Sequence, residues 1–345
     1  MRNLVSVQEI KNIEPIVGAD RIEVATILGW KLVVKKGEFK VGDKCAYFEV
    51  DSFLPINETF EFLRGSSYRK HELLGEGFRI KTQKLRGQIS QGLALSLKTL
   101  NLDENLEIGT DLTDVLHVQK WEAVEKISDF GKLKDGLPDG INKTDETRIQ
   151  SIYDDIIVEF RGRKYYISTK IDGTSITMYR KNGVFGVCSH ENEIIFDEEV
   201  PSAIWDFAKK IDLEKKMIEA NLDNIAIQGE LAGGGIQRNR LQLKEFKWFV
   251  FTIKDLTTGN RLGLDKMLEI TSKLGLETVP IEEIGDDLTI KYPTLDSLLE
   301  RAKGNYKSGQ KKEGIVIRPV EPVYSEVVHG ALSFKVLNND FLLKE

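Results

Sequence analysis

The hydrophobic pattern of the sequence changes near residue 115, and this change constrains the fold more than any other feature. Before it, residues with high strand propensity occur in six short runs: LVSVQEI, RIEVATI, WKLVVKK, KCAYFEV, GFRIKTQ and ISQGLAL. Segments rich in Gly and Asp, such as VGAD and KKGEFKVGD, separate these runs and predict turns. Five or six short strands in about 100 residues are typical of a small Greek-key barrel, for which the OB-fold is the natural candidate.

The second half of the chain mixes helices and strands. Residues 116–146 look like a linker, because Gly, Pro and Asp interrupt the string SDFGKLKDGLPDGINKTD. From residue 147 onward, strand-like runs such as YYISTK and GIVIRP occur together with segments of helical pattern at 198–219, 261–274 and 294–303. We therefore expect an α+β protein with an OB-fold at residues 1–115, a linker at 116–146 and a second domain at 147–345.

The composition fits a globular protein of about two domains. Of the 345 residues, 41% are hydrophobic and 30% are charged, which suits neither a disordered chain nor a membrane protein. The start, MRNLVSVQEIKNIEP, lacks the hydrophobic segment of a secretory signal, and Cys45 and Cys188 are the only cysteines. We expect an intracellular monomer, in the cytoplasm or nucleus, without a membrane partner.

Basic residues are concentrated locally, although the chain as a whole is acidic. The net charge of −6 argues against a surface coated with basic residues for nonspecific nucleic-acid binding. Residues 64–92, however, contain seven Lys and Arg against two Glu, and residues 301–312 contain five Lys and Arg and no acid. Ordinary solvated charge explains each segment as well as a phosphate-binding groove does. If the first segment binds RNA, the candidates are Arg79, Lys81, Lys84 and Arg86.

The string KIDGTS at residues 170–175 has chemical content. A lysine at a strand end, followed by an Asp-Gly turn, can project into a cleft while the turn approaches a ligand. A neutral lysine amine is a competent nucleophile when neighbouring cations or a metal lower its pKa. The string alone is weak, because a hairpin with an exposed lysine has the same pattern.

Four further strings follow KIDGTS in a fixed order. Glu230 lies in QGEL, Phe251 in WFVFTI, Glu313 in EGIVIR and Lys335 in SFKVL. In this order the chain resembles the covalent nucleotidyltransferases, the superfamily of ATP-dependent DNA ligases, RNA ligases and mRNA capping enzymes. Each string alone is common, but the ordered set is specific.

Longer strings point to one branch of this superfamily. RGQISQGL, KTDETRIQ, GELAGGGIQRNR and SFKVLNNDFLL resemble the Deinococcus and Naegleria group of RNA ligases, and its Naegleria side in particular. The resemblance covers essentially the whole chain. It implies an N-terminal OB-type β-barrel followed by a nucleotidyltransferase domain of antiparallel sheets with flanking helices.

The resemblance also implies a role for each motif residue. Lys170 would attack the α-phosphate of ATP, and Lys335 would neutralise the charge that develops there. Phe251 would stack on adenine, although a core aromatic in an apolar run has the same pattern. Three carboxylates would hold a hydrated Mg²⁺ or Mn²⁺ ion, because they repel each other unless a cation shares the pocket: Asp172, Glu230 and Glu313. Further candidates for ATP binding are Arg148, Gly173, Ser175, Lys311 and Lys312.

Some of these roles have simpler alternatives. The acid that matches Glu230 lies near the ribose hydroxyls in the superfamily, so a metal role is less certain for it. A strand-end acid paired with a lysine would explain Glu313 equally simply. Gln237 and Asn239, in the glycine-rich string, could contact RNA or cap a turn.

The chain departs from the family pattern at two places. Superfamily members often carry two lysines separated by one residue, whereas Ser333 and Leu337 occupy the flanking positions here. A second cation must then come from elsewhere, and Arg148, Lys311 or Lys312 are the candidates. Relatives often have Ser-Arg-Asn from the position of Ser189 onward, but this chain has His190 after the serine. A histidine carries the arginine's charge only partly at neutral pH, so His190 either assists phosphate or RNA binding or is an exposed loop residue.

These observations favour an ATP-dependent RNA ligase that joins a 3′-hydroxyl to a 5′-phosphate through a lysyl-AMP intermediate. ATP and Mg²⁺ or Mn²⁺ would be its cofactors, and RNA ends in a nicked duplex or an RNA/DNA hybrid its partners. Two alternatives stay open. One is another covalent nucleotidyltransferase, either a DNA ligase or a capping guanylyltransferase, and the other is a non-catalytic OB-type protein that binds nucleic acid.

Overall fold

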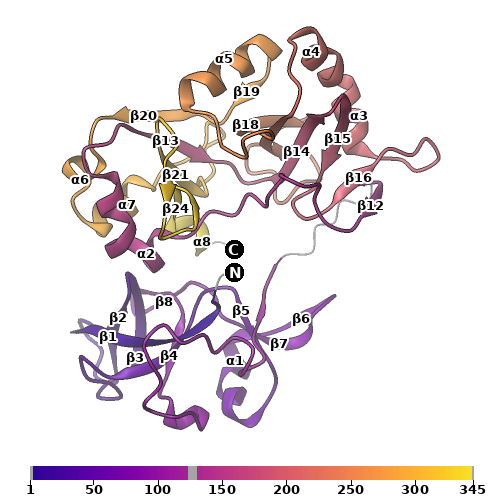
Figure 1. The fold of residues 1–345 in the computed structure, drawn as a ribbon. Coiled ribbons are helices and arrows are strands. Elements are labelled where there is room, and N and C mark those ends of the chain that lie inside the picture. Colours follow the sequence, from indigo (N-terminus) through magenta and orange to yellow (C-terminus); the bar gives the residue numbers. More distant parts are fainter. Residues whose placement is uncertain (1–2, 123–129, 344–345) are drawn as a thin grey trace. The chain divides into compact units, whose positions relative to one another are not determined.

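The computed structural model of the protein describes residues 3–122 and 130–343. These residues form two compact units, one made of residues 3–122 with 342–343 and the other of residues 130–341 (Figure 1). Residues 123–129 of the expected linker lie outside the described residues. The rest of that segment is not free of sheet structure, because β11 (Gln119–Lys120) pairs with a strand of the first unit and β12 (Lys132–Lys134) with one of the second.

The first unit is built from β-strands. A five-stranded antiparallel sheet has the order β10-β4-β1-β2-β3, and a four-stranded sheet has the order β11-β5-β7-β6. The strands and short helices of this unit are β1 (Val5–Pro15), β2 (Ile22–Ile27), β3 (Trp30–Lys35), β4 (Lys44–Phe48), β5 (Ser52–Leu54), η1 (Glu58–Leu63), α1 (Arg64–Ser67), β6 (Tyr68–His71), β7 (Gly75–Arg79), β8 (Gln83–Leu85), β9 (Gln88–Ser90), β10 (Leu93–Leu95) and η2 (Lys98–Leu100).

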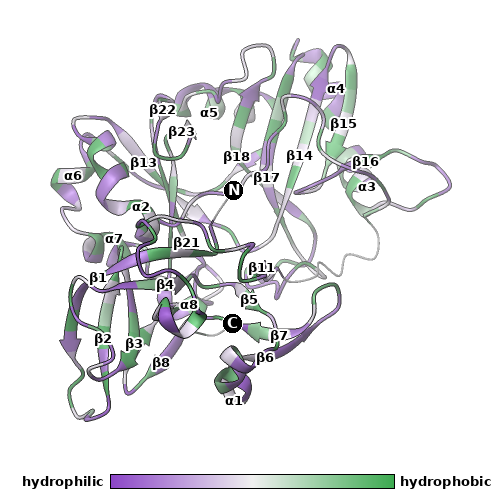
Figure 2. Ribbon diagram, turned by 60° about the horizontal axis from the view of Figure 1, so that its bottom comes forward, coloured by the Kyte–Doolittle hydropathy of each residue, from purple (hydrophilic) through white to green (hydrophobic). Residues whose placement is uncertain are grey.

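Alternation along the strands explains the core of the first unit. In β3, Trp30, Leu32 and Val34 are buried, whereas the lysines between and after them are exposed. Because side chains of a strand point alternately to its two faces, this period of two places one face against the core. Figure 2 shows the resulting change between hydrophobic and hydrophilic residues along β2 and β3. The expected strand-rich barrel is thus confirmed.

Two larger sheets form the second unit. A seven-stranded sheet has the order β12-β16-β15-β14-β17-β18-β19, and a four-stranded sheet has the order β20-β13-β21-β24. All of their strand pairs are antiparallel except β18 with β19. The strands not yet bounded are β13 (Tyr165–Lys170), β14 (Thr174–Lys181), β15 (Val184–Cys188), β16 (Glu193–Ile195), β17 (Ile225–Ala232), β18 (Lys247–Asp255), β19 (Glu277–Thr278), β20 (Ile281–Gly285), β21 (Gly314–Pro319), β22 (Tyr324–Ser325), β23 (Gly330–Ala331) and β24 (Phe334–Leu337).

Helices pack on these sheets with apolar stripes. In α5, Leu264, Met267, Ile270 and Leu274 are buried along one side and join a core cluster with Ile227 of β17. A spacing of three or four residues places such side chains on one helix face. Helices were expected at 198–219, 261–274 and 294–303, and α3, α4, α5 and α7 lie within those ranges. The helices are α2 (Ile149–Ile156), η3 (Ile157–Phe160), α3 (Ala203–Lys210), α4 (Leu213–Glu219), α5 (Leu264–Leu274), α6 (Leu288–Lys291), α7 (Leu295–Arg301) and α8 (Asn339–Leu342).

The expected α+β class, with antiparallel sheets and flanking helices in the second unit, is confirmed. Among the described residues, no helix combines the length and the apolar character needed to cross a membrane.

Candidate active site

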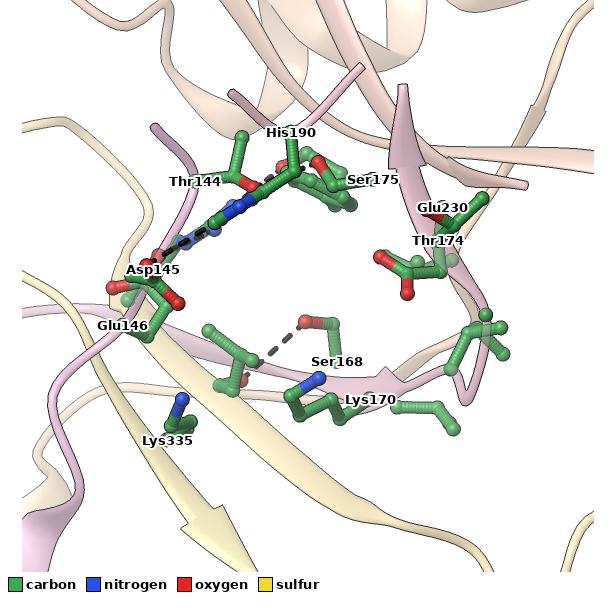
Figure 3. Close-up of a pocket in the computed structure, with 17 residues that line it drawn as sticks. Thr144, Asp145, Glu146, Ser168, Lys170, Thr174, Ser175, His190, Glu230 and Lys335 are labelled. Atoms are coloured by element: carbon green, nitrogen blue, oxygen red, sulfur yellow. Dashed lines mark hydrogen bonds and ion pairs between the residues drawn. The ribbon is translucent and has the colours of Figure 1, made fainter. Parts of the chain in front are cut away.

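Both large sheets of the second unit contribute side chains to one cavity. It brings together seven of the residues singled out in the sequence: Lys170, Gly173, Ser175, His190, Glu230, Phe251 and Lys335. Lys170, Lys335 and Glu230 face a shared space, with His190 and Asp145 on another side of it (Figure 3). The motif strings therefore meet in space although they are up to 165 positions apart in the sequence.

Lys170 ends β13, and its backbone pairs with that of Gly314 in β21. This register places the lysine beside Glu313, and the Nζ of Lys170 donates a hydrogen bond of 2.9 Å to the Glu313 carboxylate. Tyr306 fixes both residues, because its hydroxyl donates to the carbonyl of Lys170 at 2.8 Å and accepts from the backbone N–H of Glu313 at 3.0 Å. Tyr306 was not singled out in the sequence.

The carboxylates keep Lys170 protonated in this arrangement. Burial by itself would lower the pKa of Lys170, but the nearby charges of Glu313 and Glu230 outweigh it and raise the pKa well above its usual value. A protonated amine has no free electron pair for attack on phosphorus. Lys170 must therefore lose its pairing with Glu313, and its proton, before it can act as a nucleophile.

The pKa of Asp172 is set by opposing influences. The guanidinium of Arg240 lies 3.1 Å from its carboxylate. Burial and the charge of Glu313 nevertheless raise the pKa of Asp172 to about 6, against the opposing effect of Arg240. Arg240 is itself buried and stacks on the ring of Phe341, 4.0 Å from the ring centre. The pairing of Asp172 with Arg240 spans 68 positions, and no local pattern in the sequence announces it.

Gly173 allows two strands to approach each other closely. A Cβ atom at this position would lie 2.3 Å from the carbonyl oxygen of Leu231 and 2.9 Å from Cγ of Glu230. Ser175 lies opposite Glu230 in the register of β14 and β17. The Gly173 of the KIDGTS string thus serves close packing next to Glu230, which holds that carboxylate at the edge of the cavity.

Phe251 lines the cavity from β18, and Arg318 supports it from β21. The Arg318 guanidinium donates to the carbonyl of Phe251, to Thr252 at 3.1 Å, to Ser333 at 3.1 Å and to Glu146 at 2.7 Å. Burial, which raises the pKa of a carboxylate, is outweighed at Glu146 by Arg261 and Arg318, so that the pKa of Glu146 lies below its usual value. Arg318 thereby links β18, the residue before β24 and the segment before α2, although no string in the sequence predicted this role.

Glu146 is held ionised by its neighbours, although burial of a carboxylate disfavours its charged form. Burial alone would raise the pKa of Glu146, and the two guanidinium groups of Arg261 and Arg318 reverse this effect. Glu146 is therefore ionised and part of a buried ion-pair network at the inner wall of the cavity.

Lys335 is the second lysine that faces the cavity. Its backbone N–H donates to the carbonyl of Thr147 at 2.9 Å, and Arg148 bridges to it from the neighbouring chain segment. Burial, together with the positive charges of Lys170 and Arg148, lowers the pKa of Lys335 to about 8. Arg148 thus lies beside Lys335, as a source of the second positive charge would, although it does not line the cavity itself.

Residues 143–148, here called the strap, connect both sides of the site. Its first half contacts the seven-stranded sheet and its turns: Lys143 pairs with Glu191, Thr144 contacts Ser175 at 2.7 Å, and Asp145 lies 3.4 Å from His190. Its second half contacts the four-stranded sheet: Glu146 binds Arg318, and Thr147 and Arg148 lie along Lys335. This region was expected to be a linker up to residue 146, yet residues 144–146 line the cavity.

Six other residues predicted for the second unit's site do not line the cavity: Asp172 and Glu313, which neighbour Lys170, and Lys311, Lys312, Gln237 and Asn239. Lys312 is buried and bonds Glu282 at 2.6 and 2.8 Å, and Lys311 lies 3.3 Å from Asp340. Asn239 bonds both ways with the backbone of Leu243, which agrees with the turn-capping alternative. Gln237 has a positive φ of 46° in the same loop.

In residues 64–92, here called the basic strip, three of the seven basic side chains are paired with acids. Arg79 pairs with Asp51 and Lys70 with Glu76, and Arg64 pairs with Glu61. Lys84 and Arg86 are exposed on the β8–β9 hairpin, where Arg86 and Gly87 both adopt positive φ, as a tight two-residue hairpin turn requires. Lys81 is half-buried just before this hairpin.

Comparison with known families agrees with this site. A family model described as RNA ligase matches residues 163–337, and an OB-fold domain model matches residues 4–97. A search of curated proteins gave no match. The chain belongs to the RNA ligase family.

Solved structures of Naegleria gruberi RNA ligase match the whole chain. The complex of that enzyme with pyrophosphate is 31% identical, with a TM-score of 0.88 over 100% of this chain and 99% of that chain. A variant with a lysine replaced by alanine, with ATP and Mn, is also 31% identical, with a TM-score of 0.88 over 99% of each chain. A glutamate-to-alanine variant with AMP and Mn is 31% identical, with a TM-score of 0.89 over 100% and 99%. The predicted resemblance is thereby confirmed.

Proposed function

We propose that the protein is an ATP-dependent RNA ligase that seals 3′-hydroxyl and 5′-phosphate ends. The observation that carries this proposal is the convergence of Lys170, Lys335, Glu230 and Phe251 on one cavity. These groups provide a nucleophile, a cation, a carboxylate and an aromatic face, which together suit the transfer of a nucleotide to an amine. Relatives in the family have been solved with ATP, AMP and pyrophosphate.

In the first step, Lys170 attacks the α-phosphate of ATP. The Nζ–P bond forms as the bond to the β-phosphate oxygen breaks, so that pyrophosphate leaves and lysyl-AMP remains. Phe251 stacks on the adenine base, and Lys335 stabilises negative charge on the α-phosphate. Glu313 is the first acceptor for the Lys170 proton, because its carboxylate already accepts a hydrogen bond from that N–H.

The chemistry of the site fits a hydrated divalent ion. The carboxylates of Asp172, Glu230 and Glu313 are hard oxygen donors, which Mg²⁺ and Mn²⁺ prefer. Among the described residues, however, no three His, Cys, Asp or Glu groups lie close enough together to enclose a metal. We therefore assign these carboxylates to a metal held through its water molecules, which would offset the charge on the phosphates and favour the neutral form of Lys170.

Two transfers complete the reaction. The AMP passes from Lys170 to the 5′-phosphate of an RNA end, which creates a phosphoanhydride. The 3′-hydroxyl of the other end then attacks this 5′-phosphate, the phosphodiester forms, and AMP leaves. Each step transfers a phosphoryl-type group, for which positioning and charge neutralisation supply most of the catalysis. We propose a nicked duplex or an RNA/DNA hybrid as the substrate, held in part by Lys81, Lys84 and Arg86 of the first unit.

The decisive experiment is adenylylation with α-labelled ATP and Mg²⁺ or Mn²⁺. The wild-type protein should carry label that survives denaturation, and Lys170→Ala should carry none. Lys170→Ala should nevertheless seal a nick whose 5′ end already carries AMP, because the lysine takes part only in the AMP transfers. Circular dichroism of the variant serves as the folding control.

Other results would contradict the proposal in distinct ways. Label from GTP but not from ATP would indicate a capping guanylyltransferase. Label from ATP combined with sealing of DNA ends alone would indicate a DNA ligase. A folded, unmodified wild-type protein that takes no label would leave a nucleic-acid-binding role without catalysis.

A further inference from the structure

His190 occupies a defined place at the cavity rather than a loose loop. It lies in the turn between β15 and β16, where the hydroxyl of Ser189 accepts the backbone N–H of Asn192 at 3.1 Å. The His190 side chain is 23% exposed, lines the cavity, and has its Nε2 atom 3.4 Å from the carboxylate of Asp145. The imidazole ring is therefore held by the strap and still reaches the space that Lys170 and Lys335 face (Figure 3).

Two of the other positive groups around this cavity already bind protein partners. The ammonium of Lys170 binds Glu313, and the guanidinium of Arg318 donates to Glu146, Ser333, Thr252 and the backbone of Phe251. Within the part of the chain that the structure describes, the cations lining the cavity are Lys170, Lys335, Arg318 and, when protonated, His190. Among these lining groups, histidine is the side-chain type that proteins use most often as a charge switch near neutral pH.

The groups around His190 favour exchange of its carboxylate partner for an anionic ligand. Asp145, from the strap, is 52% exposed, and the adjacent Glu191 is paired with Lys143. Thr144 and Ser175 are neutral neighbours, while Lys335 on β24 and Glu230 on β17 face the same cavity. An exposed ion pair contributes little to stability, so Asp145 can turn to solvent at small cost when a phosphate approaches the ring.

We propose that protonated His190 binds a phosphate oxygen of the substrate and makes one step of ligation depend on pH near neutrality. Asp145 positions the imidazole ring until the phosphate replaces it. This inference rests on the proposed ligase function. The phosphate has two possible sources, the β- and γ-phosphates of ATP and the 5′-phosphate of the RNA end.

Two substitutions at His190 test whether its positive charge is needed. His190→Arg has a permanent charge at this position, whereas His190→Asn keeps a polar side chain without a charge. The rates of lysyl-AMP formation, AMP transfer to RNA and nick sealing are measured from pH 6 to 9 for both variants and the wild type. Each variant's rate is then divided by the wild-type rate at the same pH. The ratio cancels effects that all three proteins share, such as the titration of Lys335 and Asp172 and the deprotonation of Lys170.

The expected ratio of His190→Arg to wild type rises at least fivefold between pH 6 and 9, because the arginine keeps its charge while the histidine loses its own. The ratio of His190→Asn to wild type starts well below one at pH 6 and approaches one at pH 8.5. If His190→Arg does not fold, the ratio of His190→Asn to wild type tests the proposal by itself. Ratios that do not change with pH would overturn the proposal.

Three separate assays locate the phosphate and separate this inference from the proposed function. They measure lysyl-AMP formation, AMP transfer to a nicked duplex with a 5′-phosphate, and sealing of a pre-adenylylated nick. A pH-dependent ratio in the first assay identifies the phosphates of ATP, and one confined to the second identifies the RNA 5′-phosphate. A pH-dependent ratio in the third assay also identifies the RNA 5′-phosphate, because the 3′-hydroxyl attacks this phosphate in the sealing step. Ratios that stay constant with pH in all three assays would contradict the proposal. Failure of the wild type to form lysyl-AMP would instead reject the ligase function itself.

Discussion

Two lysines that face the same cavity differ in pKa because of their neighbours. Lys170 has two carboxylates nearby, which keep its pKa high, whereas Lys335 lies beside Lys170 and Arg148, and its pKa falls to about 8. The first residue is thus stored as a protonated amine, and the second is a cation that titrates within an accessible pH range. Side-chain type alone does not distinguish them, because the distinction comes from their surroundings.

The pKa of Lys335 predicts that ATP binding weakens as the pH rises. A lysine with a pKa of about 8 is roughly 90% charged at pH 7 and roughly 10% charged at pH 9, so the dissociation constant should increase up to about tenfold. Lys170 keeps its charge over this interval because its pKa is raised, and Asp172 is already ionised. Isothermal titration calorimetry with ATP at both pH values provides the measurement.

Two variants provide the controls for this prediction. Lys335→Arg keeps a positive charge at both pH values and should show little pH dependence. Lys335→Met should bind weakly at both. An unchanged affinity of the wild-type protein from pH 7 to 9 would show that Lys335 does not meet the phosphates.

The sequence identified the residues that carry recognisable chemistry but not those that hold them. Lys170, Glu230, Phe251 and Lys335 all line the cavity, as their ordered strings predict. Arg318, which bonds Glu146 at a separation of 172 positions, could not be found from local pattern. For the same reason, Lys312 was a candidate phosphate ligand, although its partner is Glu282 on another strand. The roles of these residues in catalysis stay predictions.

At the scale of elements, the site depends on how closely neighbouring strands approach each other. At the start of β14, the absence of a side chain on Gly173 leaves room for the carbonyl of Leu231 on β17. The sequence predicted the strands and most helices here, because their hydrophobic periods are clear. It could not predict their order in the sheets or the attachment of the strap to both of them, since these depend on contacts between distant segments.

We predict that Gly173→Ala disturbs β17 and lowers the rate of lysyl-AMP formation at least tenfold. The new methyl group would meet the backbone of Leu231 and the side chain of Glu230, and such overpacking also costs about 1–3 kcal/mol of stability. Labelled-ATP adenylylation and urea denaturation measure the two effects.

Gly234 provides a matched control for this substitution. A Cβ atom there meets nothing within 4 Å, and the residue has no positive φ. Gly234→Ala should therefore behave like the wild type in both assays. Equal effects of the two substitutions would show that the close approach of Leu231 to Gly173 does not cause the loss of adenylylation or of stability.

At the scale of the whole molecule, the cavity is built entirely from the second unit, whereas the β8–β9 hairpin belongs to the first. The strand-rich pattern and basic strip of the first unit were visible in the sequence. The pairing of Arg64, Lys70 and Arg79 with acids was not, because two of the three partners are not adjacent on one helix and depend on the folded sheet. Within residues 64–92, Lys84 and Arg86 are exposed cations on this hairpin that can contact a nucleic-acid backbone.

This division predicts that the double variant Lys84→Ala/Arg86→Ala forms lysyl-AMP at the wild-type rate but binds nicked duplex RNA more weakly. Loss of two phosphate contacts should reduce the slope of log affinity against log salt concentration by roughly 2. Fluorescence anisotropy at several salt concentrations measures that slope. Lys210→Ala/Lys215→Ala removes the same charge from an exposed part of the second unit and should leave the slope unchanged.

The ion pair between Lys170 and Glu313 also lowers the reactivity of Lys170 toward reagents that modify amines. Acylating and carbamylating reagents consume lysines through their neutral form, and the pairing leaves very little of that form at Lys170. The nucleophile is therefore protected from accidental modification while no substrate is bound. Lys335, with a pKa of about 8, has no such protection at neutral pH. Inactivation by an amine reagent small enough to enter the cavity should accordingly begin at Lys335.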